Sequence, residues 1–147
     1  MKPARFAQYV RVSTEAFAAS LLGAGLYSPE EAIAESRRQF DVNLPHGVET
    51  AGQHLYAVKS AGSEVGILWF AMRNRAGQGH AFIYDIEVSA EHRGQGYGTA
   101  MMLAAEQEAQ RLGAISLGLH VFADNAPAIR MYEGLGYQRV QEYLLLT

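Results

Sequence analysis

A short glycine-rich segment carries the clearest chemical pattern in the sequence. Residues 93–99 read Arg-Gly-Gln-Gly-Tyr-Gly-Thr, with glycine at three alternate positions. Glycine lets the backbone turn tightly and approach a ligand without a Cβ in the way. Successive amides in such a turn, together with the first N–H groups of a following helix, bind anions. The segment therefore predicts a phosphate or pyrophosphate site, to which Arg93 and Thr99 can add a guanidinium and a hydroxyl.

Two well-known nucleotide motifs do not fit this segment. No Gly-Lys-Ser/Thr follows it, so the Walker pattern fails, and Thr99 stands where the dinucleotide fingerprint requires glycine. No acidic residue near 117–119 is available to hold a ribose. A glycine-rich turn without any ligand remains the alternative.

A second group of residues lies further along the chain. Asn125 and Tyr132 are separated by about two helical turns, so both side chains can face one groove. The plainer interpretation is that Asn125 only caps a helix and Tyr132 is a half-buried aromatic residue.

The rest of the sequence predicts the elements that position these two motifs. Apolar residues at helical spacing fill the first third, where Ser28 and Glu31 form a capping box. Short turns between the following strands favour antiparallel hairpins, and the strand–helix–strand order over 80–122 implies a parallel pair with a right-handed crossover. We therefore expect an α/β fold, a mixed sheet with helices on both faces. Its strands are predicted over 54–59, 64–73, 80–89 and 115–122, with a terminal strand or a bent hairpin over 137–146. Its helices are predicted over 3–23, 28–40, 97–112 and 126–133.

Composition limits the classes of function. The chain has 147 residues, 49% of them hydrophobic, a net charge of -3 and no cysteine. Cysteine nucleophiles, disulfides and thiolate zinc sites are excluded, and the scattered histidines lack metal spacing, so no metal is expected. The charge argues against a nucleic-acid partner, and the longest strongly apolar stretch, 66–72, is too short to cross a membrane. We expect one cytoplasmic domain over 1–147.

Together the two motifs resemble a known family. The pattern Arg-x-x-Gly-x-Gly at 93–98, after the strand 84–88, resembles the acetyl-CoA signature of the GCN5-related N-acetyltransferases (GNAT). Residues 119–137 resemble that superfamily's second motif, and the match covers about residues 54–147. The resemblance implies a mostly antiparallel sheet with one splayed parallel pair, and acetyl-CoA as the acyl donor.

The resemblance also assigns residues to the coenzyme. Backbone groups of the strand before the glycine loop pair with the pantetheine arm, here from Ile86 and Val88. Asn125 contacts the coenzyme, and Tyr132 lies beside the sulfur. The loop that holds the pyrophosphate corresponds to Arg93, Gly94, Gln95, Gly96, Tyr97, Gly98 and Thr99.

The implied reaction is direct acetyl transfer from the thioester to a primary amine of a small molecule or peptide. An alkylamine is almost fully protonated at neutral pH, so a base must take its proton. Glu87 and His120 are the candidate bases, with Asp85 on the same strand face as Glu87. Tyr132 is the expected general acid, because a phenol can donate to the departing sulfur. Each candidate base could instead have a purely structural role, Glu87 as a carboxylate hydrogen-bonded within the fold and His120 as a hydrogen-bonded histidine of the sheet.

Further expectations concern the alternative function, the acceptor pocket, Trp69 and the start of the chain. A non-catalytic acyl-CoA-binding sensor or scaffold is the alternative function. By the resemblance, Tyr27 and the loop 41–52 lie where the acceptor pocket is usually built, and Trp69 is expected in the core or a cleft wall. Family members usually begin with a strand, whereas this chain enters a helix at about Pro3. Either the sheet lacks that edge strand or the sequence starts downstream of a longer one; a missing strand favours a homodimer.

Overall fold

The computed structural model describes residues 1–121 and 124–140. Most predicted elements are confirmed. The second helix continues past Phe40 to Asn43. The strand predicted over 115–122 runs instead from Ala114 to Leu119; residues 120 and 121 are not part of it, and Phe122 lies outside the described residues. No strand includes 137–140, and the rest of the predicted C-terminal strand, 141–146, also lies outside the description. The elements are α1 (Pro3–Gly23), α2 (Pro29–Asn43), η1 (Gly47–Glu49), β1 (Gln53–Ser60), β2 (Ser63–Arg75), β3 (Gln78–Val88), η2 (Ala90–His92), α3 (Tyr97–Arg111), β4 (Ala114–Leu119) and α4 (Ala126–Gly134).

The four described strands form one mixed sheet in the order β1-β2-β3-β4. β1 with β2 and β2 with β3 are antiparallel, and β3 with β4 is parallel. The last pair between β3 and β4 joins Ile83 to Leu119, yet β3 continues to Val88. The end of β3 is therefore free of its parallel neighbour, which is the predicted splay.

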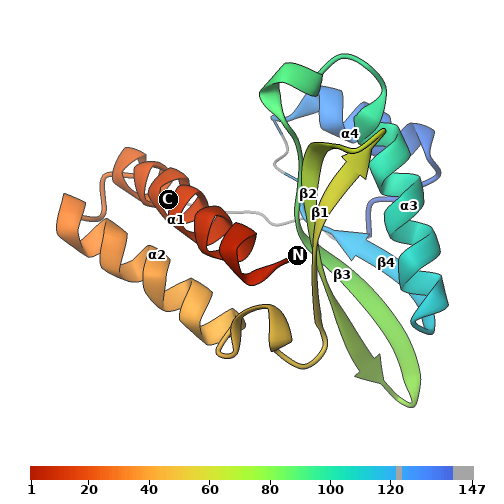
Figure 1. Ribbon diagram of the computed structural model, residues 1–147, viewed down its shortest axis with the longest axis horizontal. Helices are drawn as coiled ribbons and strands as arrows, with labels where there is room; N and C mark the ends of the chain where they lie inside the picture. Colours follow the sequence, from red (N-terminus) through yellow and green to blue (C-terminus); the bar gives the residue numbers. More distant parts are fainter. Residues whose placement is uncertain (122–123, 141–147) are drawn as a thin grey trace.

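Helices cover both faces of the sheet, as predicted. Figure 1 shows α1 and α2 beside one face and α3 beside the other. Because side chains alternate along a strand, β2 supplies both layers. Ile67 and Trp69 pack with Tyr9 of α1, whereas Leu68 and Phe70 pack with the α3 side.

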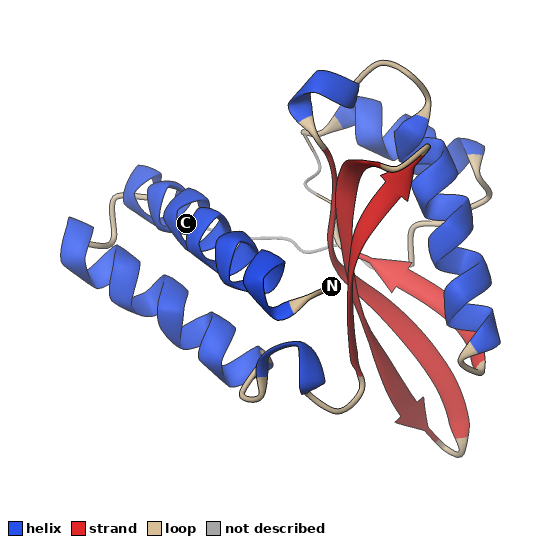
Figure 2. Ribbon diagram, in the orientation of Figure 1, coloured by secondary structure: helices blue, strands red, loops and turns tan. Residues whose placement is uncertain are grey.

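The first helix is tied to the sheet at its beginning. The chain enters α1 at Pro3, and the two residues ahead of it, Met1 and Lys2, are not in a strand. The amino group of Met1 donates to the carbonyl of Leu55 in β1 at 2.8 Å. The Arg5 guanidinium forms a two-pronged ion pair with Glu64 at the start of β2, at 2.8 and 2.9 Å. These contacts join the start of α1 to β1 and β2. Figure 2 shows the α1–α2 pair beside the sheet.

Local sequence accounts for the start of the second helix. The predicted capping box is present, since the Ser28 side chain accepts from the amide of Glu31 and the Glu31 carboxylate accepts from the amide of Ser28.

Over residues 1–121 and 124–140, none of the helices has the length and apolar character needed to cross a membrane.

Candidate active site

A β-bulge in β3 shapes the face that turns toward α1 and α2. In the pairing with β2, Trp69 is opposite Asp85 and the next residue, Phe70, is opposite Ile83. Tyr84 is therefore an extra residue without a partner, and the alternation of side chains is shifted at this point. As a result, Tyr84 and Asp85 both line the same cleft although they are consecutive, and Glu87 lines it too.

This cleft has a volume of ≈ 350 Å³ and lies between the α1–α2 pair and strands β2 and β3. That volume is at the lower end of small-molecule sites, which range over roughly 300–1,000 Å³. The lining combines two carboxylates, several aromatic rings and neutral polar groups. The residues are Tyr9, Ser13, Ala16, Phe17, Ser20, Gln39, Phe40, Asn43, Trp69, Tyr84, Asp85 and Glu87.

A tyrosine from α1 holds one of the two carboxylates. Tyr9 is 3% exposed, and its hydroxyl donates to Oδ2 of Asp85 at 2.7 Å. Burial raises the pKa of Asp85, and the bond from Tyr9 opposes that rise by stabilising the ionised form. The pKa of the Tyr9 phenol is raised strongly by burial and by the Asp85 charge, so it stays a donor.

The second carboxylate, Glu87, is open to solvent at the same cleft. Partial desolvation raises its pKa, the charge of Asp85 raises it further, and Arg93 opposes both effects. A carboxyl with a raised pKa accepts a proton more readily than an ordinary glutamate. Glu87 therefore has the position and the electrostatics of a base.

Aromatic rings form one wall of the cleft. Trp69 stacks on Phe40 at 6.1 Å on one side and on Tyr84 at 4.8 Å on the other. Its indole N–H donates to Oε1 of Gln53 at 2.7 Å, which fixes the ring. The predicted role of Trp69 as core or cleft wall is confirmed in both senses, since it is 6% exposed and lines the cleft.

The glycine-rich loop follows the splayed end of β3 after Ser89 and the short helix η2. Gly94 and Gly96 have φ of +74° and +83°, a left-handed conformation that favours glycine, and Gly96 is the N-cap of α3. A Cβ on Gly98 would lie 3.4 Å from the sulfur of Met131 in α4. The first amides of α3 have no intrahelical acceptor, so they are free to bind an anion.

Side chains of this loop fold back onto the preceding turn. Nε of Arg93 donates to the carbonyl of Val88 at 3.3 Å, and Nε2 of Gln95 donates to the carbonyl of Glu91 at 3.3 Å. Thr99 lies exposed in the first turn of α3. Ile86 and Val88 lie on β3 beyond its last pair with β4.

The residues of the second motif occupy α4 and its approach. The Asn125 side chain accepts from the amide of Ala128 at 3.3 Å, so it caps α4 as the plainer interpretation had it. Tyr132 is half-buried against the α3-side core, and burial raises the pKa of its phenol. His120 is exposed just after β4, with its ring edge-on to Phe82 at 5.1 Å. Neither Tyr132 nor His120 lines the cleft that contains Glu87.

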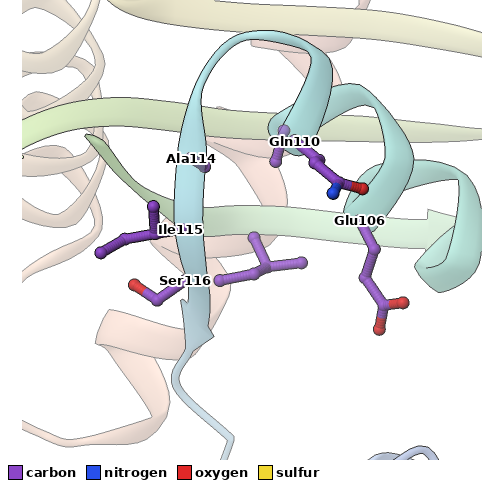
Figure 3. Close-up of a pocket in the computed structure, with 7 residues that line it drawn as sticks. Glu106, Gln110, Ala114, Ile115 and Ser116 are labelled. Carbon is purple, nitrogen blue, oxygen red and sulfur yellow. The ribbon is translucent and has the colours of Figure 1, made fainter. Parts of the chain in front are cut away.

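A second hollow of ≈ 350 Å³ lies between α3 and β4 and shares no residue with the cleft. Figure 3 shows Glu106 and Gln110 of α3 beside Ile115 and Ser116 of β4. The Glu106 carboxylate accepts from the hydroxyl of Tyr137 at 2.9 Å, so its polar character is structural. Within the described part of the chain, no group of three or more His, Asp or Glu side chains is placed to hold a metal ion.

Sequence patterns missed part of the cleft. Tyr27 does not line it, and within 41–52 only Asn43 does, because α2 continues to that residue. The wall comes instead from helical residues such as Tyr9, which pattern alone places in the apolar stripe of the first helix, and Phe40, which is predicted only as the end of the second helix. The available signal for Tyr9 was chemical, since a buried phenol requires a hydrogen-bond partner.

The mixed sheet, its splayed parallel pair and the glycine loop that opens α3 define a domain of the acyltransferase type. The profile of the Acetyltransferase (GNAT) family matches residues 23–137, and the chain belongs to that family.

Relatives support this assignment over most of the chain. The uncharacterized N-acetyltransferase YycN of Bacillus subtilis (strain 168) is 36% identical over 139 residues, which is 94% of this chain and 89% of YycN. The crystal structure of the putative acetyltransferase YycN from Bacillus subtilis superposes with a TM-score of 0.88 at 34% identity, covering 100% of this chain and 94% of that one. A mycothiol acetyltransferase of Pseudarthrobacter chlorophenolicus is 36% identical over 87 residues, 58% of this chain and 27% of that protein.

Proposed function

We propose that the chain transfers the acetyl group of acetyl-CoA directly to a primary amine of a small molecule or peptide. The observation that carries the proposal is the position of Glu87. It lies in a ligand-sized cleft, on the part of β3 that has left β4, a few residues before the glycine loop. A base for the amine thus lies on the same strand that leads to the anion-binding turn. The mycothiol acetyltransferase relative is named for a small-molecule acceptor, which agrees with this proposal.

The residues present fit the coenzyme. Gly94 and Gly96 are exposed, and their left-handed backbone leaves the loop open, because no heavy atom lies within 4 Å of a Cβ built on either. The free amides at the start of α3, with Arg93, would hold the pyrophosphate. Acetyl-CoA supplies the acetyl group as a thioester, which reacts readily with a neutral amine.

The chain's own residues move two protons. Glu87 takes the proton from the acceptor nitrogen, directly or through one water, so that the nitrogen lone pair can form the new C–N bond. As the C–S bond breaks, the nitrogen releases its second proton to water, and Tyr132 donates its phenolic proton to the departing sulfur and is then reprotonated from solvent. The raised pKa of Tyr132 keeps the phenol protonated until that step. His120 remains the second candidate base, and its place outside the cleft lining favours Glu87.

The test is thiol release from acetyl-CoA across a panel of primary amines, with kcat/KM measured against pH. Glu87→Gln is expected to lower kcat/KM by about 10²–10⁴, as general bases do, and to remove the acid limb of the profile. His120→Gln is expected to stay within about tenfold of the parent chain. Tyr132→Phe should lower kcat and leave coenzyme A affinity unchanged by calorimetry. A chain that binds acetyl-CoA and releases no thiol with any amine is a sensor rather than an enzyme.

A further inference from the structure

The charges and rings that line the cleft define a narrower class of acceptor. We propose that the cleft binds a small cationic arylalkylamine and rejects amines that carry a carboxylate next to the amino group. This inference rests on the proposed function, since the cleft is an acceptor site only if the chain acetylates an amine.

The first argument is charge. Asp85 and Glu87 are the ionisable acids of the lining, and none of the described residues that line the cleft is Lys, Arg or His. An ammonium ion entering the cleft therefore meets two carboxylates and no cationic side chain in the lining itself. A carboxylate on the carbon next to the amine would be placed against the same two groups without a partner, and such like-charge contacts are strongly unfavourable.

Two arginines outside the lining make contacts of their own. Arg93 lies in the glycine loop and donates to the carbonyl of Val88. Arg73 lies over the rings of Phe82 and Tyr84, at 4.9 and 5.6 Å from their centroids, and donates to the Tyr84 hydroxyl. Neither guanidinium lines the cleft.

The second argument is the aromatic surface. Phe17 of α1 and Phe40 of α2 face the cleft together with Trp69 and Tyr84 of the sheet. Tyr84 is 38% exposed, which leaves ring surface for a ligand. Aromatic rings attract cations and also pack against other rings in edge-on or offset geometry. A ligand with an aryl group a short chain away from its ammonium matches both features.

The third argument is size and polarity. A volume of ≈ 350 Å³ suits a compact molecule better than a peptide segment. The remaining polar lining, from Ser13, Ser20, Gln39 and Asn43, is neutral, so it can hydrogen-bond to a substituent without requiring a charge. The cleft thus selects on positive charge and on ring surface.

The experiment compares kcat/KM for four probes by thiol release: 2-phenylethylamine, L-phenylalanine, L-phenylalaninamide and ethanolamine. Phenylalanine adds only a carboxylate to phenylethylamine, and the amide restores neutrality with nearly the same shape. We expect phenylethylamine to exceed phenylalanine by about 100-fold or more, the amide to recover most of that loss, and ethanolamine to be at least about tenfold poorer than phenylethylamine.

Two variants assign the discrimination to the cleft. Asp85→Asn keeps an oxygen that can accept from Tyr9 but removes one charge, so the ratio of phenylethylamine to phenylalanine should fall several-fold. Glu30→Gln removes the same charge from an exposed position at the start of α2, outside the cleft, and should leave the ratio unchanged. An equal fall of this ratio in both variants would mean that the net charge of the whole protein, rather than the cleft, selects the substrate, and it would overturn the inference.

The outcomes separate this inference from the proposed function. Phenylalanine used as well as phenylethylamine, with the activity on phenylalanine lost in Arg73→Gln, would show that Arg73 binds the carboxylate and would overturn the inference alone. Thiol release with ethanolamine but not phenylethylamine would do the same. Thiol release with no primary amine at all would overturn the proposed function and this inference together.

Discussion

Removing the Tyr9 hydroxyl is expected to destabilise the chain in a pH-dependent way. Tyr9→Phe keeps the buried ring but deletes the donor that lies 2.7 Å from Oδ2 of Asp85. A hydrogen bond to a charged group contributes roughly 1.5–3 kcal/mol to the free energy of unfolding. For a domain of this size, a loss of about 2 kcal/mol lowers Tm by roughly 4–8 °C.

The sign of the pH dependence follows from Asp85. Burial raises its folded-state pKa, and the Tyr9 bond lowers it by favouring the carboxylate. The bond therefore contributes fully while Asp85 is ionised, and its contribution is lost as the pH falls through the folded-state pKa. The effect of Tyr9→Phe should be largest at about pH 7.5 and smaller at about pH 4, because a carboxyl whose pKa is raised takes up its proton at a higher pH than an ordinary aspartate.

Urea unfolding of both chains at the two pH values measures this difference. Tyr27→Phe is the control, because the Tyr27 hydroxyl has no partner in the described part of the chain and its loss should change stability by less than about 0.5 kcal/mol. An equal loss at both pH values would show that the Tyr9 hydroxyl acts by packing alone and would refute the electrostatic account of the cleft.

Three further predictions concern the backbone and one ion pair. Gly66→Ala should lower the free energy of unfolding, measured with urea, by about 1–3 kcal/mol, because the new Cβ would lie 2.2 Å from a β3 carbonyl oxygen. Gly134→Ala is the control and should leave that free energy nearly unchanged, since no heavy atom lies within 4 Å of a Cβ at this position. Gly96→Ala should weaken coenzyme A binding about tenfold by calorimetry, since an L-residue at φ +83° is strained; unchanged affinity would remove the loop from the site. Arg5→Gln should lower the free energy of unfolding by about 1 kcal/mol or less, because the ion pair with Glu64 is partly exposed. The loss should be smaller in high salt, which screens the pair, and a loss that does not depend on salt would contradict this.

The order and type of the elements were predictable because each depends on local pattern. The capping box at Ser28 and Glu31 marks the start of α2, and the change of apolar period marks α3. The glycine loop was predictable for the same reason, since the left-handed positions of Gly94 and Gly96 are local requirements. These features involve neighbours in sequence, where residue type alone carries the information.

The cleft was less predictable because it is made by distant contacts. Strict alternation on β3 puts Tyr84 on the face opposite Asp85, and the bulge brings both to one face. The Tyr9–Asp85 bond joins residues 76 positions apart, and nothing in either local pattern specifies the other partner. Phe40 was likewise assigned to the end of a helix, whereas α2 continues and Phe40 stacks on Trp69 in the wall.

The most direct test of the central claim is the rate of thiol release from acetyl-CoA as a function of added primary amine, with the product identified by mass spectrometry. The proposed function predicts saturable release that requires the amine, an N-acetylated product in equal amount, and loss of both in Glu87→Gln. Tight acetyl-CoA binding with no release above the amine-free rate across the whole panel would contradict it.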